Sequence, residues 1–390
     1  MGFIKGDKYI RYWLAIMFIV SLVAVASAST PVSIRSHGNS LSVVVKHLIY
    51  WAIALGAIYA LSKAPAGAYN MLYNTAEILV IISIFLLILT NLYGVEVNGA
   101  KRWLKISNGI TLQTADLFKF SIITLAAKYL SNARDDIKEL NKAIKYSAVF
   151  LAIGLFFILR EDLSTAALIV ILYLAMFFIG NIPYKYFAAI LGSVVVLGAI
   201  ILVLAYTVPN KGRLGTWHNR IENFISGGDG YQATVAKAAI AEGGLIRFAP
   251  GQSKIKNLLP QASSDFIYSI IVEEYGLVGG VFIIFLYLGF GWRSMRILKR
   301  VKRSFAMYLV AGYSMLIVVQ AFMHILVNVG LMPVTGQPLP FISKGGTFLV
   351  VSGFMVGIIL NISRTYDAKE SSDSKNLNED PLINNVILMD

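Results

Sequence analysis

The chain is a succession of long apolar runs separated by short polar or charged stretches. A mostly apolar run of about 20 residues is long enough to cross the hydrocarbon core of a membrane as a helix. The pattern therefore predicts an all-α polytopic membrane protein with about ten transmembrane helices. The runs lie at about 12–28, 41–62, 75–93, 117–130, 146–159, 164–180, 186–208, 265–290, 305–331 and 348–362.

Composition supports this class and excludes several kinds of site. Hydrophobic residues make up 57% of the 390 residues, the mean hydropathy is +0.69, and 14% of residues are charged. Soluble domains carry roughly 25% charged residues. The chain has no cysteine, which excludes disulfides, thiolate catalysis and cysteine-ligated metals. Its four histidines have no HExxH-like spacing, so the sequence offers no recognisable zinc motif.

The distribution of charge predicts which way the chain crosses the membrane. Lys5, Lys8 and Arg11 precede the first span, and residues 291–304 contain six basic side chains and no acid. The positive-inside rule places both segments, the 131–145 loop and the two termini in the cytoplasm. Residues 94–116, 209–264 and 332–347 then lie outside, and the last of these is called the Pro/Gly loop below. The net charge of +13 is attributed to orientation and contact with anionic lipid rather than nucleic acid.

Two further expectations concern the ends of the chain. Small residues at 24–28 resemble a signal-peptidase site, so a cleaved signal is an alternative to a retained first span. We favour the retained span because no soluble exported domain follows it. At the other end, we expect a membrane domain over 1–366 and a polar, disordered cytoplasmic tail over 367–390.

The two long outer loops are basic, although outer loops usually are not. Long loops often escape the positive-inside rule, so this charge is compatible with simple tolerance. The alternative is that the basic residues bind an anionic ligand such as a lipid pyrophosphate. Both interpretations stay open at this point.

Asp265 stands where the largest outer loop, 209–264, meets the eighth span. Ser263 and Ser264 precede it, so we expect Asp265 in the first turn of the helix, where free N–H groups and the helix dipole favour an anion. One interpretation is that the carboxylate merely caps the helix. The other is that it acts as a general base at the membrane surface.

Other polar residues in the spans suggest packing rather than chemistry. Gln320, His324 and Asn328 form a stripe on the ninth span, which predicts interhelical hydrogen bonds. Aromatic residues near span ends are expected to be interfacial anchors, and these are Trp51, Tyr93, Trp103 and Trp292. There is no P-loop, GxSxG or dinucleotide fingerprint, so any reaction is expected at the outer face.

Four outer segments, in order and at sensible spacing, resemble the SEDS family, the FtsW/RodA/SpoVE-type polymerases of bacterial peptidoglycan. The departures from the family pattern are Thr114-Ala115-Asp116 in place of Pro-Ser-Glu, Glu161 in place of proline, and Lys344 in place of tyrosine. The matching segments are NGAKRW at 98–103 with 112–119, EDLST at 161–165, YQ at 231–232 with LPQA and DFI within 259–267 and EEYG at 273–276, and GQPLPFISKGG at 336–346.

The resemblance implies a glycosyltransferase that joins lipid II disaccharides by β-1,4 bonds and releases undecaprenyl pyrophosphate. Position by position, it assigns Asp265 as the catalytic carboxylate of an inverting reaction. Gly6-Asp7 and Ser27-Ala28-Ser29 resemble the division-type FtsW branch more than the elongation branch. A lipid II flippase of the same fold and a non-catalytic scaffold for division proteins are the alternatives.

The leaving pyrophosphate needs cationic neutralisation. The candidates are Arg102, Lys119, Arg220, Lys101 and Lys344, and Gln232 and Glu273 are further candidates for the same cavity. The alternative for Arg102 and Lys119 is structural ion pairing with Asp116 or Asp162. By contrast, Glu274 is expected to pack against another span through a cation or a hydroxyl.

Cofactors and partners follow only from the resemblance. No dedicated carboxylate cage for a metal is visible, so a divalent Mg or Mn ion is expected only as a companion of the pyrophosphate. The implied partners are a class B penicillin-binding protein, which is a transpeptidase, and division regulators of the FtsQ–FtsL–FtsB type. The implied location is the bacterial cytoplasmic membrane at the division septum.

Overall fold

The computed structural model describes residues 4–35, 40–97, 100–107, 110–132, 137–180, 188, 191–192, 222, 230–259, 261–301 and 305–378. Arg220 and all but three residues of the seventh expected span, 186–208, lie outside this part of the chain. The long helices are α1 (Lys8–Arg35), α2 (Ser40–Lys63), α3 (Asn70–Tyr93), α4 (Thr114–Asn132), α5 (Ile137–Glu161), α6 (Leu163–Ile179), α10 (Ile267–Arg300), α11 (Phe305–Asn328) and α12 (Thr347–Asn378).

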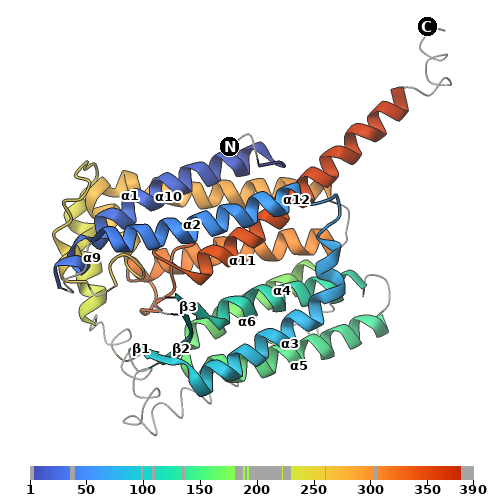
Figure 1. Ribbon diagram of the computed structural model, residues 1–390, viewed down its shortest axis with the longest axis horizontal. Coiled ribbons are helices and arrows are strands. Elements are labelled where there is room, and N and C mark those ends of the chain that lie inside the picture. The colour runs from blue at the N-terminus through green and yellow to red at the C-terminus, as the bar shows by residue number, and fades with distance from the viewer. Residues whose placement is uncertain are drawn as a thin grey trace.

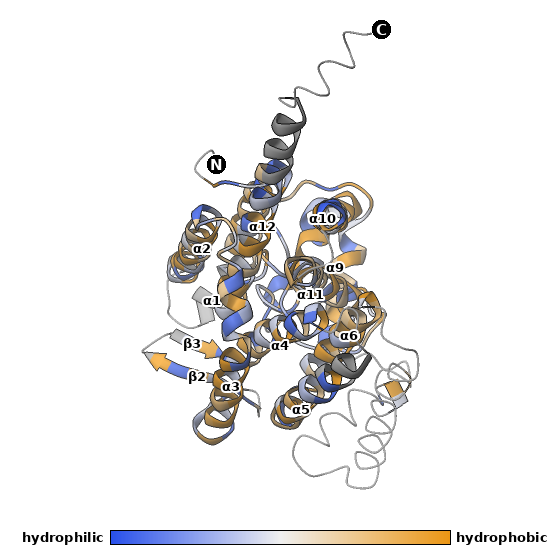
Figure 2. Ribbon diagram, turned by 90° about the vertical axis from the view of Figure 1, so that its right-hand side faces the viewer, coloured by the Kyte–Doolittle hydropathy of each residue, from blue (hydrophilic) through white to orange (hydrophobic). Residues whose placement is uncertain are grey.

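The prediction of an all-helical membrane protein is confirmed. Of the described helices, α1, α2, α3, α10, α11 and α12 are long and apolar enough to cross a membrane, and α6 is a shorter apolar helix. The helices run side by side in one bundle (Figure 1). Viewed along the bundle, α4 and α11 lie near its centre, with α2, α3, α5 and α10 around them (Figure 2).

Two helix boundaries differ from the predictions. The charged segment 131–145 was expected to be a loop, but α5 already begins at Ile137, because Ile137, Leu140 and Ile144 repeat at helical spacing. Residues 367–378 were expected to belong to a disordered tail, but α12 continues through them as far as Asn378. Polar residues therefore extend both helices past the apolar runs by which the spans were identified.

The outer segments gather at one end of the bundle (Figure 1). The first outer loop is an antiparallel sheet of β1 (Val95–Val97), β2 (Ala100–Ser107) and β3 (Ile110–Gln113), in that order. The largest loop contributes α9 (Tyr231–Gly243) and the 3₁₀ turn η1 (Ile255–Asn257), and α9 packs on α10 and α11. The expectation that these loops share one face is therefore consistent with the structure.

Helix α10 is interrupted at Gly276, whose φ of 68° is left-handed. Hydrogen bonds between the helix and the preceding loop satisfy backbone groups at the break. Leu277 N–H donates to Gly244 O at 2.9 Å, and Ala249 N–H donates to Glu274 O at 2.8 Å. Such repair is needed because an unpaired backbone group is costly where water is scarce.

The prediction for Trp51 was wrong. This side chain is fully buried, its indole N–H donates to Ser21 Oγ at 3.1 Å, and its ring packs on Phe18 and Phe341. Because Trp51 points toward the Pro/Gly loop rather than toward lipid, it is a core residue. In contrast, Tyr93 and Trp292 are 76% and 58% exposed, as interfacial anchors would be.

Small residues set the close approach of α12 to α2. A side chain added at Gly353 would place its Cβ 3.0 Å from backbone atoms of Ala54. Gly56, on α2 itself, has nothing within 4 Å of the same position. Small residues are a common means of bringing membrane helices together.

Gly353→Leu is therefore expected to destabilise the protein, by about 1–3 kcal/mol if it behaves as overpacked cores do. The matched control is Gly56→Leu, which adds the same side chain in open space. The measurement is the thermal unfolding midpoint of each purified variant in detergent. Equal midpoints for both variants would contradict the proposed close contact of α12 with α2.

Candidate active site

A cavity of about 700 Å³ lies at the outer end of the bundle. Its walls come from α2, the sheet, α9, the turn at 261–266, the Pro/Gly loop and the start of α12, so it joins the three loops that were predicted to lie outside. Among the described lining residues, the charged and amide side chains are three basic groups, three amides and one carboxylate, which is Asp265. These side chains are Lys46, Arg102, Gln113, Gln232, Gln261, Asp265 and Lys344.

Asp265 lies in the turn before α10 and not in the first turn of the helix, so that prediction was wrong. The turn is closed by Asp265 N–H donating to Gln261 O at 3.0 Å, with Gln261 at a φ of 67°. The first turn of α10 finds another acceptor, because Ser269 N–H donates to Asn328 Oδ1 at 3.2 Å. Asn328 thus satisfies the helix start, and the Asp265 carboxylate lines the cavity instead.

One polar stripe on α11 supports both irregular segments of the cavity wall. Asn328 Nδ2 donates to Asp265 O at 3.2 Å, and Gln320 Nε2 donates to Pro338 O at 3.1 Å. Between them, His324 Nδ1 donates to Gln337 O at 2.8 Å. The predicted interhelical bonds also exist, from Lys119 to Gln320 and from Ser269 to Asn328. The stripe therefore positions the Asp265 turn relative to the Pro/Gly loop.

Arg102, on β2, lines the cavity but has a carboxylate partner. Its guanidinium lies 3.1 Å from Asp162 Oδ2, and its Nε donates to Glu161 O at 3.1 Å. Asp162 also caps α6 by accepting from Thr165 N–H at 3.1 Å. The Arg102 side chain is therefore fixed at the α5–α6 turn, with most of its charge balanced there.

Gly336 lies between Arg102 and Asp265. A Cβ added to it would be 3.3 Å from Asp265 Oδ2 and 3.9 Å from Arg102 Nη1. Its φ of 71° is in the left-handed region, which favours glycine. The guanidinium and the carboxylate therefore approach the same point of the Pro/Gly loop.

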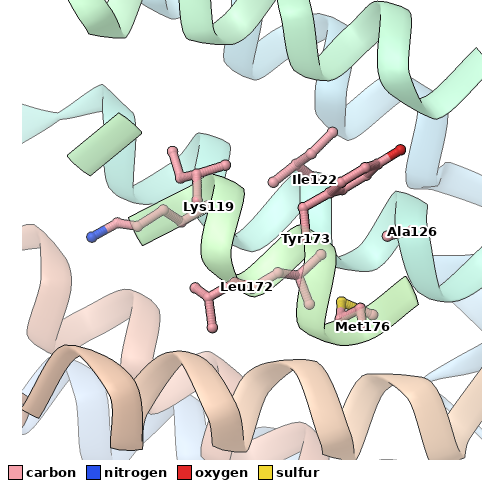
Figure 3. A pocket seen from close by; sticks show the side chains of 8 residues that line it. Lys119, Ile122, Ala126, Leu172, Tyr173 and Met176 are labelled. Atoms are coloured by element: carbon pink, nitrogen blue, oxygen red, sulfur yellow. The ribbon is translucent and has the colours of Figure 1, made fainter. Parts of the chain in front are cut away.

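Lys119 does not line this cavity. It is 1% exposed, and its ammonium lies 2.8 Å from Asp116 Oδ1 and 3.1 Å from Gln320 Oε1. Its aliphatic chain borders a separate apolar pocket of about 10 Å³ between α4 and α6. Figure 3 shows the ammonium pointing away from the other labelled residues of that pocket.

Lys344 and Lys46 line the cavity from two segments that are far apart in the sequence, the Pro/Gly loop and α2. Lys344 N–H donates to Ser263 O at 2.8 Å, which attaches this residue to the Asp265 turn. Partial burial lowers the pKa of Lys344, and the positive charge of Lys46 lowers it further. Gln232, from α9, completes the set of predicted residues that the cavity brings together: Asp265, Arg102, Gln232 and Lys344.

The prediction that Glu273 lines the cavity was wrong. Glu273 is fully buried and accepts from Ser253 Oγ, from Lys254 N–H at 2.7 Å and from Ile255 N–H at 3.3 Å. It therefore holds the η1 turn against α10. Glu274 accepts from Ser27 Oγ on α1, so its predicted hydroxyl contact with another span is confirmed.

Lys101 also lies apart from the cavity. It borders a pocket of about 20 Å³ near the α5–α6 turn, and its backbone N–H donates to Glu161 Oε2 at 2.9 Å. Conversely, sequence reasoning missed Lys46 and His47, because they stand within an apolar run that indicated only a span. It also treated Trp103 as an anchor, whereas Trp103 lines the cavity.

The cavity combines a carboxylate with several cations. A carboxylate can accept a proton from a hydroxyl, and cations can neutralise an anionic leaving group. Across the described residues, no group of three His, Cys, Asp or Glu side chains converges to hold a metal ion. The carboxylate and the cations of the cavity together suit a reaction in which a hydroxyl gives up a proton and an anionic group leaves.

Comparisons with known proteins agree with one another. The FtsW/RodA/SpoVE model, described as "Cell cycle protein", matches residues 7–368. A probable peptidoglycan glycosyltransferase FtsW of Idiomarina loihiensis is 31% identical over 346 residues, covering 87% of this chain and 82% of the relative. Stage V sporulation protein E of Bacillus subtilis is 28% identical over 353 residues, covering 90% and 94%.

Solved structures show the same fold. One comes from work on "Structural coordination of polymerization and crosslinking by a peptidoglycan synthase complex", with a TM-score of 0.75, 21% identity, and coverage of 93% of this chain and 98% of that one. Another is the rod shape determining protein RodA of Thermus thermophilus, with a TM-score of 0.66, 20% identity, and coverage of 92% and 97%.

The buried Asp116–Lys119 pair gives a testable prediction about stability. Lys119→Met leaves the Asp116 carboxylate buried without its cation, which typically costs about 3–5 kcal/mol. The double variant Asp116→Asn with Lys119→Met removes both charges and is expected to regain much of the loss. Thermal unfolding in detergent measures both. A double variant less stable than the single one would contradict a pairing role.

Proposed function

The chain belongs to the FtsW/RodA/SpoVE family of cell cycle proteins, and on this basis we propose that it is a peptidoglycan glycosyltransferase working at the outer face of the cytoplasmic membrane. It polymerises lipid II, joining the disaccharides by β-1,4 bonds and releasing undecaprenyl pyrophosphate. The observation that carries this proposal is the placement of Asp265 on the wall of a basic cavity of about 700 Å³.

The proposed mechanism uses Asp265 as a general base. Its carboxylate accepts the proton of the acceptor sugar's 4-hydroxyl while that oxygen forms a bond to the anomeric carbon of the donor. The bond from that carbon to the pyrophosphate oxygen breaks on the opposite face, so the configuration is inverted. The pyrophosphate departs with the bonding electrons, and Asp265 later releases the proton to solvent.

Several features support Asp265 in this role. Its backbone is held by Asn328 and by the turn from Gln261. Ser264 Oγ donates to its Oδ1 at 2.8 Å, which helps to hold the carboxylate in place. A base must be ionised and must be held in place to accept a proton efficiently.

The proposal includes a partner and a place. We propose that a class B penicillin-binding protein cross-links the new strands and that both proteins work at the division septum. The fold is shared with a protein studied in a peptidoglycan synthase complex, and FtsW is among the similar relatives. We also propose that regulators of the FtsQ–FtsL–FtsB type are partners of this protein.

Asp265→Asn is expected to abolish polymerisation of purified lipid II while leaving the protein folded. Asparagine has nearly the same shape but cannot take up the proton. Glycan strands separated on a gel, with the transpeptidase present, give the measurement. Glu242→Gln is the matched control, because Glu242 is an exposed outer carboxylate on α9 that pairs with Lys254 away from the cavity.

A folded Asp265→Asn variant that still makes strands at the wild-type rate would refute the assignment. If neither protein makes strands but the wild type moves lipid II across liposome membranes, the flippase alternative is favoured instead. If Asp265→Asn supports division normally in cells, the scaffold alternative is favoured, because a scaffold needs no base.

Gly336→Ala is expected to lower polymerisation strongly at normal protein abundance. Alanine at a φ of 71° is strained by about 1–2 kcal/mol. The added Cβ would also lie 3.3 Å from Asp265 Oδ2. Gly345→Ala in the same loop is the control, since its Cβ would meet its neighbours at 3.8 Å or more. Similar activity of the two variants would argue against a role for the Gly336 contact.

A further inference from the structure

The cations of the cavity fall into two classes according to their partners. Arg102 is paired with Asp162 at 3.1 Å, and Lys119 is buried with Asp116 outside the cavity. Lys46 and Lys344 line the cavity, and neither forms an ion pair with a carboxylate in the part of the chain that the structure describes. Their charges are therefore available to an anion that enters the cavity.

The two segments that carry these lysines, α2 and the Pro/Gly loop, pack against each other. Lys46 is on α2, next to His47, whose Nε2 lies 2.7 Å from Ser21 Oγ. That hydroxyl donates to Ile342 O at 3.0 Å, which ties α1 and α2 to the Pro/Gly loop. A Cβ at Gly346 would lie 2.8 Å from the Tyr50 ring, so the loop also lies directly against α2.

Two positive charges that border one cavity repel each other. Their mutual effect is visible in the pKa of Lys344, which burial lowers and which the charge of Lys46 lowers further. An anion with two or more charges would relieve the repulsion and gain from both ammonium groups. A group with a single charge would gain less, and a neutral group would gain nothing.

We propose that Lys46 and Lys344 together form the diphosphate subsite of the cavity, holding the pyrophosphate of the lipid-linked donor and then of the leaving group. The identification of the ligand as a lipid pyrophosphate rests on the proposed function. Arg102 and Lys119, by contrast, position α4, β2 and α6 through their carboxylate partners. Lys344 takes this role at a position where the family motif commonly has tyrosine.

The subsite is connected directly to the proposed base. Lys344 N–H donates to Ser263 O at 2.8 Å, and Ser343 Oγ donates to Ser264 O at 2.6 Å. These are the two residues before Asp265, so the Pro/Gly loop and the Asp265 turn form one hydrogen-bonded unit. A diphosphate held by Lys344 is thereby kept at a fixed position relative to the Asp265 carboxylate, which is what alignment of the anomeric carbon requires.

The test is binding of farnesyl pyrophosphate, farnesyl monophosphate and farnesol to the purified full-length protein in detergent, for example by thermophoresis. The wild type is expected to bind the pyrophosphate at least tenfold more tightly than the monophosphate. Lys46→Gln and Lys344→Gln are each expected to weaken pyrophosphate binding about tenfold or more, since hydrogen bonds to charged groups contribute that much. Binding of farnesol should not change.

Two variants make the result specific. Lys254→Gln removes a lysine that is 75% exposed and paired with Glu242 away from the cavity, and it should bind as the wild type does. Lys46→Arg keeps the charge and should retain most of the pyrophosphate affinity. Unfolding midpoints for every variant identify those that fail to fold. If Lys46→Gln fails to fold, the affinity of Lys46→Arg for the pyrophosphate tests the role of the charge at position 46.

The outcomes separate this inference from the proposed function. Wild-type pyrophosphate affinity in the double variant Lys46→Gln with Lys344→Gln would overturn the subsite, even if the protein polymerises lipid II. Equal losses for pyrophosphate and farnesol would also overturn it, because they indicate damage to the apolar part of the cavity. Lysine-dependent binding without any polymerisation would support the subsite while the glycosyltransferase proposal fails.

Discussion

The structure depends on one constraint, which is that irregular backbone near a membrane must find its hydrogen-bond partners within the protein. The Asp265 turn and the Pro/Gly loop are both irregular, and both border the bundle. Gln320, His324 and Asn328 on α11 donate to carbonyl groups of these segments. Three side chains at helical spacing on one buried helix thereby fix the shape of the cavity wall.

The same constraint explains how charge is distributed. Charged groups that lie inside the bundle are paired, as Lys119 is with Asp116, because an isolated buried ion is too costly. Glu273 and Glu274 are also buried, and they accept hydrogen bonds from the loop around Ser253. Charges without such partners are tolerated at the cavity, where water and an anionic ligand can reach them. Burial therefore separates the charges that build the protein from those that are suited to binding.

Much of the fold could be predicted from the apolar runs and the stripe on α11, because both express helical periodicity directly. Details at helix ends could not. Asp265 was expected in the first turn of α10, but Asn328, which is 63 residues away in sequence, supplies the acceptor there. Trp51 was expected at the membrane interface, but the Pro/Gly loop folds back over it and buries it against Phe341. In each case a residue distant in the chain decided the outcome.

By itself, the sequence determined the membrane class, most of the spans and the resemblance that selected Asp265, and it predicted that the polar loops lie outside. These properties depend on local composition, periodicity and short motifs. Only the tertiary structure decided which predicted residues share a cavity. It brought Asp265, Arg102, Gln232 and Lys344 together, added Lys46, and placed Lys119, Lys101 and Glu273 elsewhere. The physical reason is that a cation's role depends on whether a carboxylate lies within reach of it, and helices far apart in the chain set that distance.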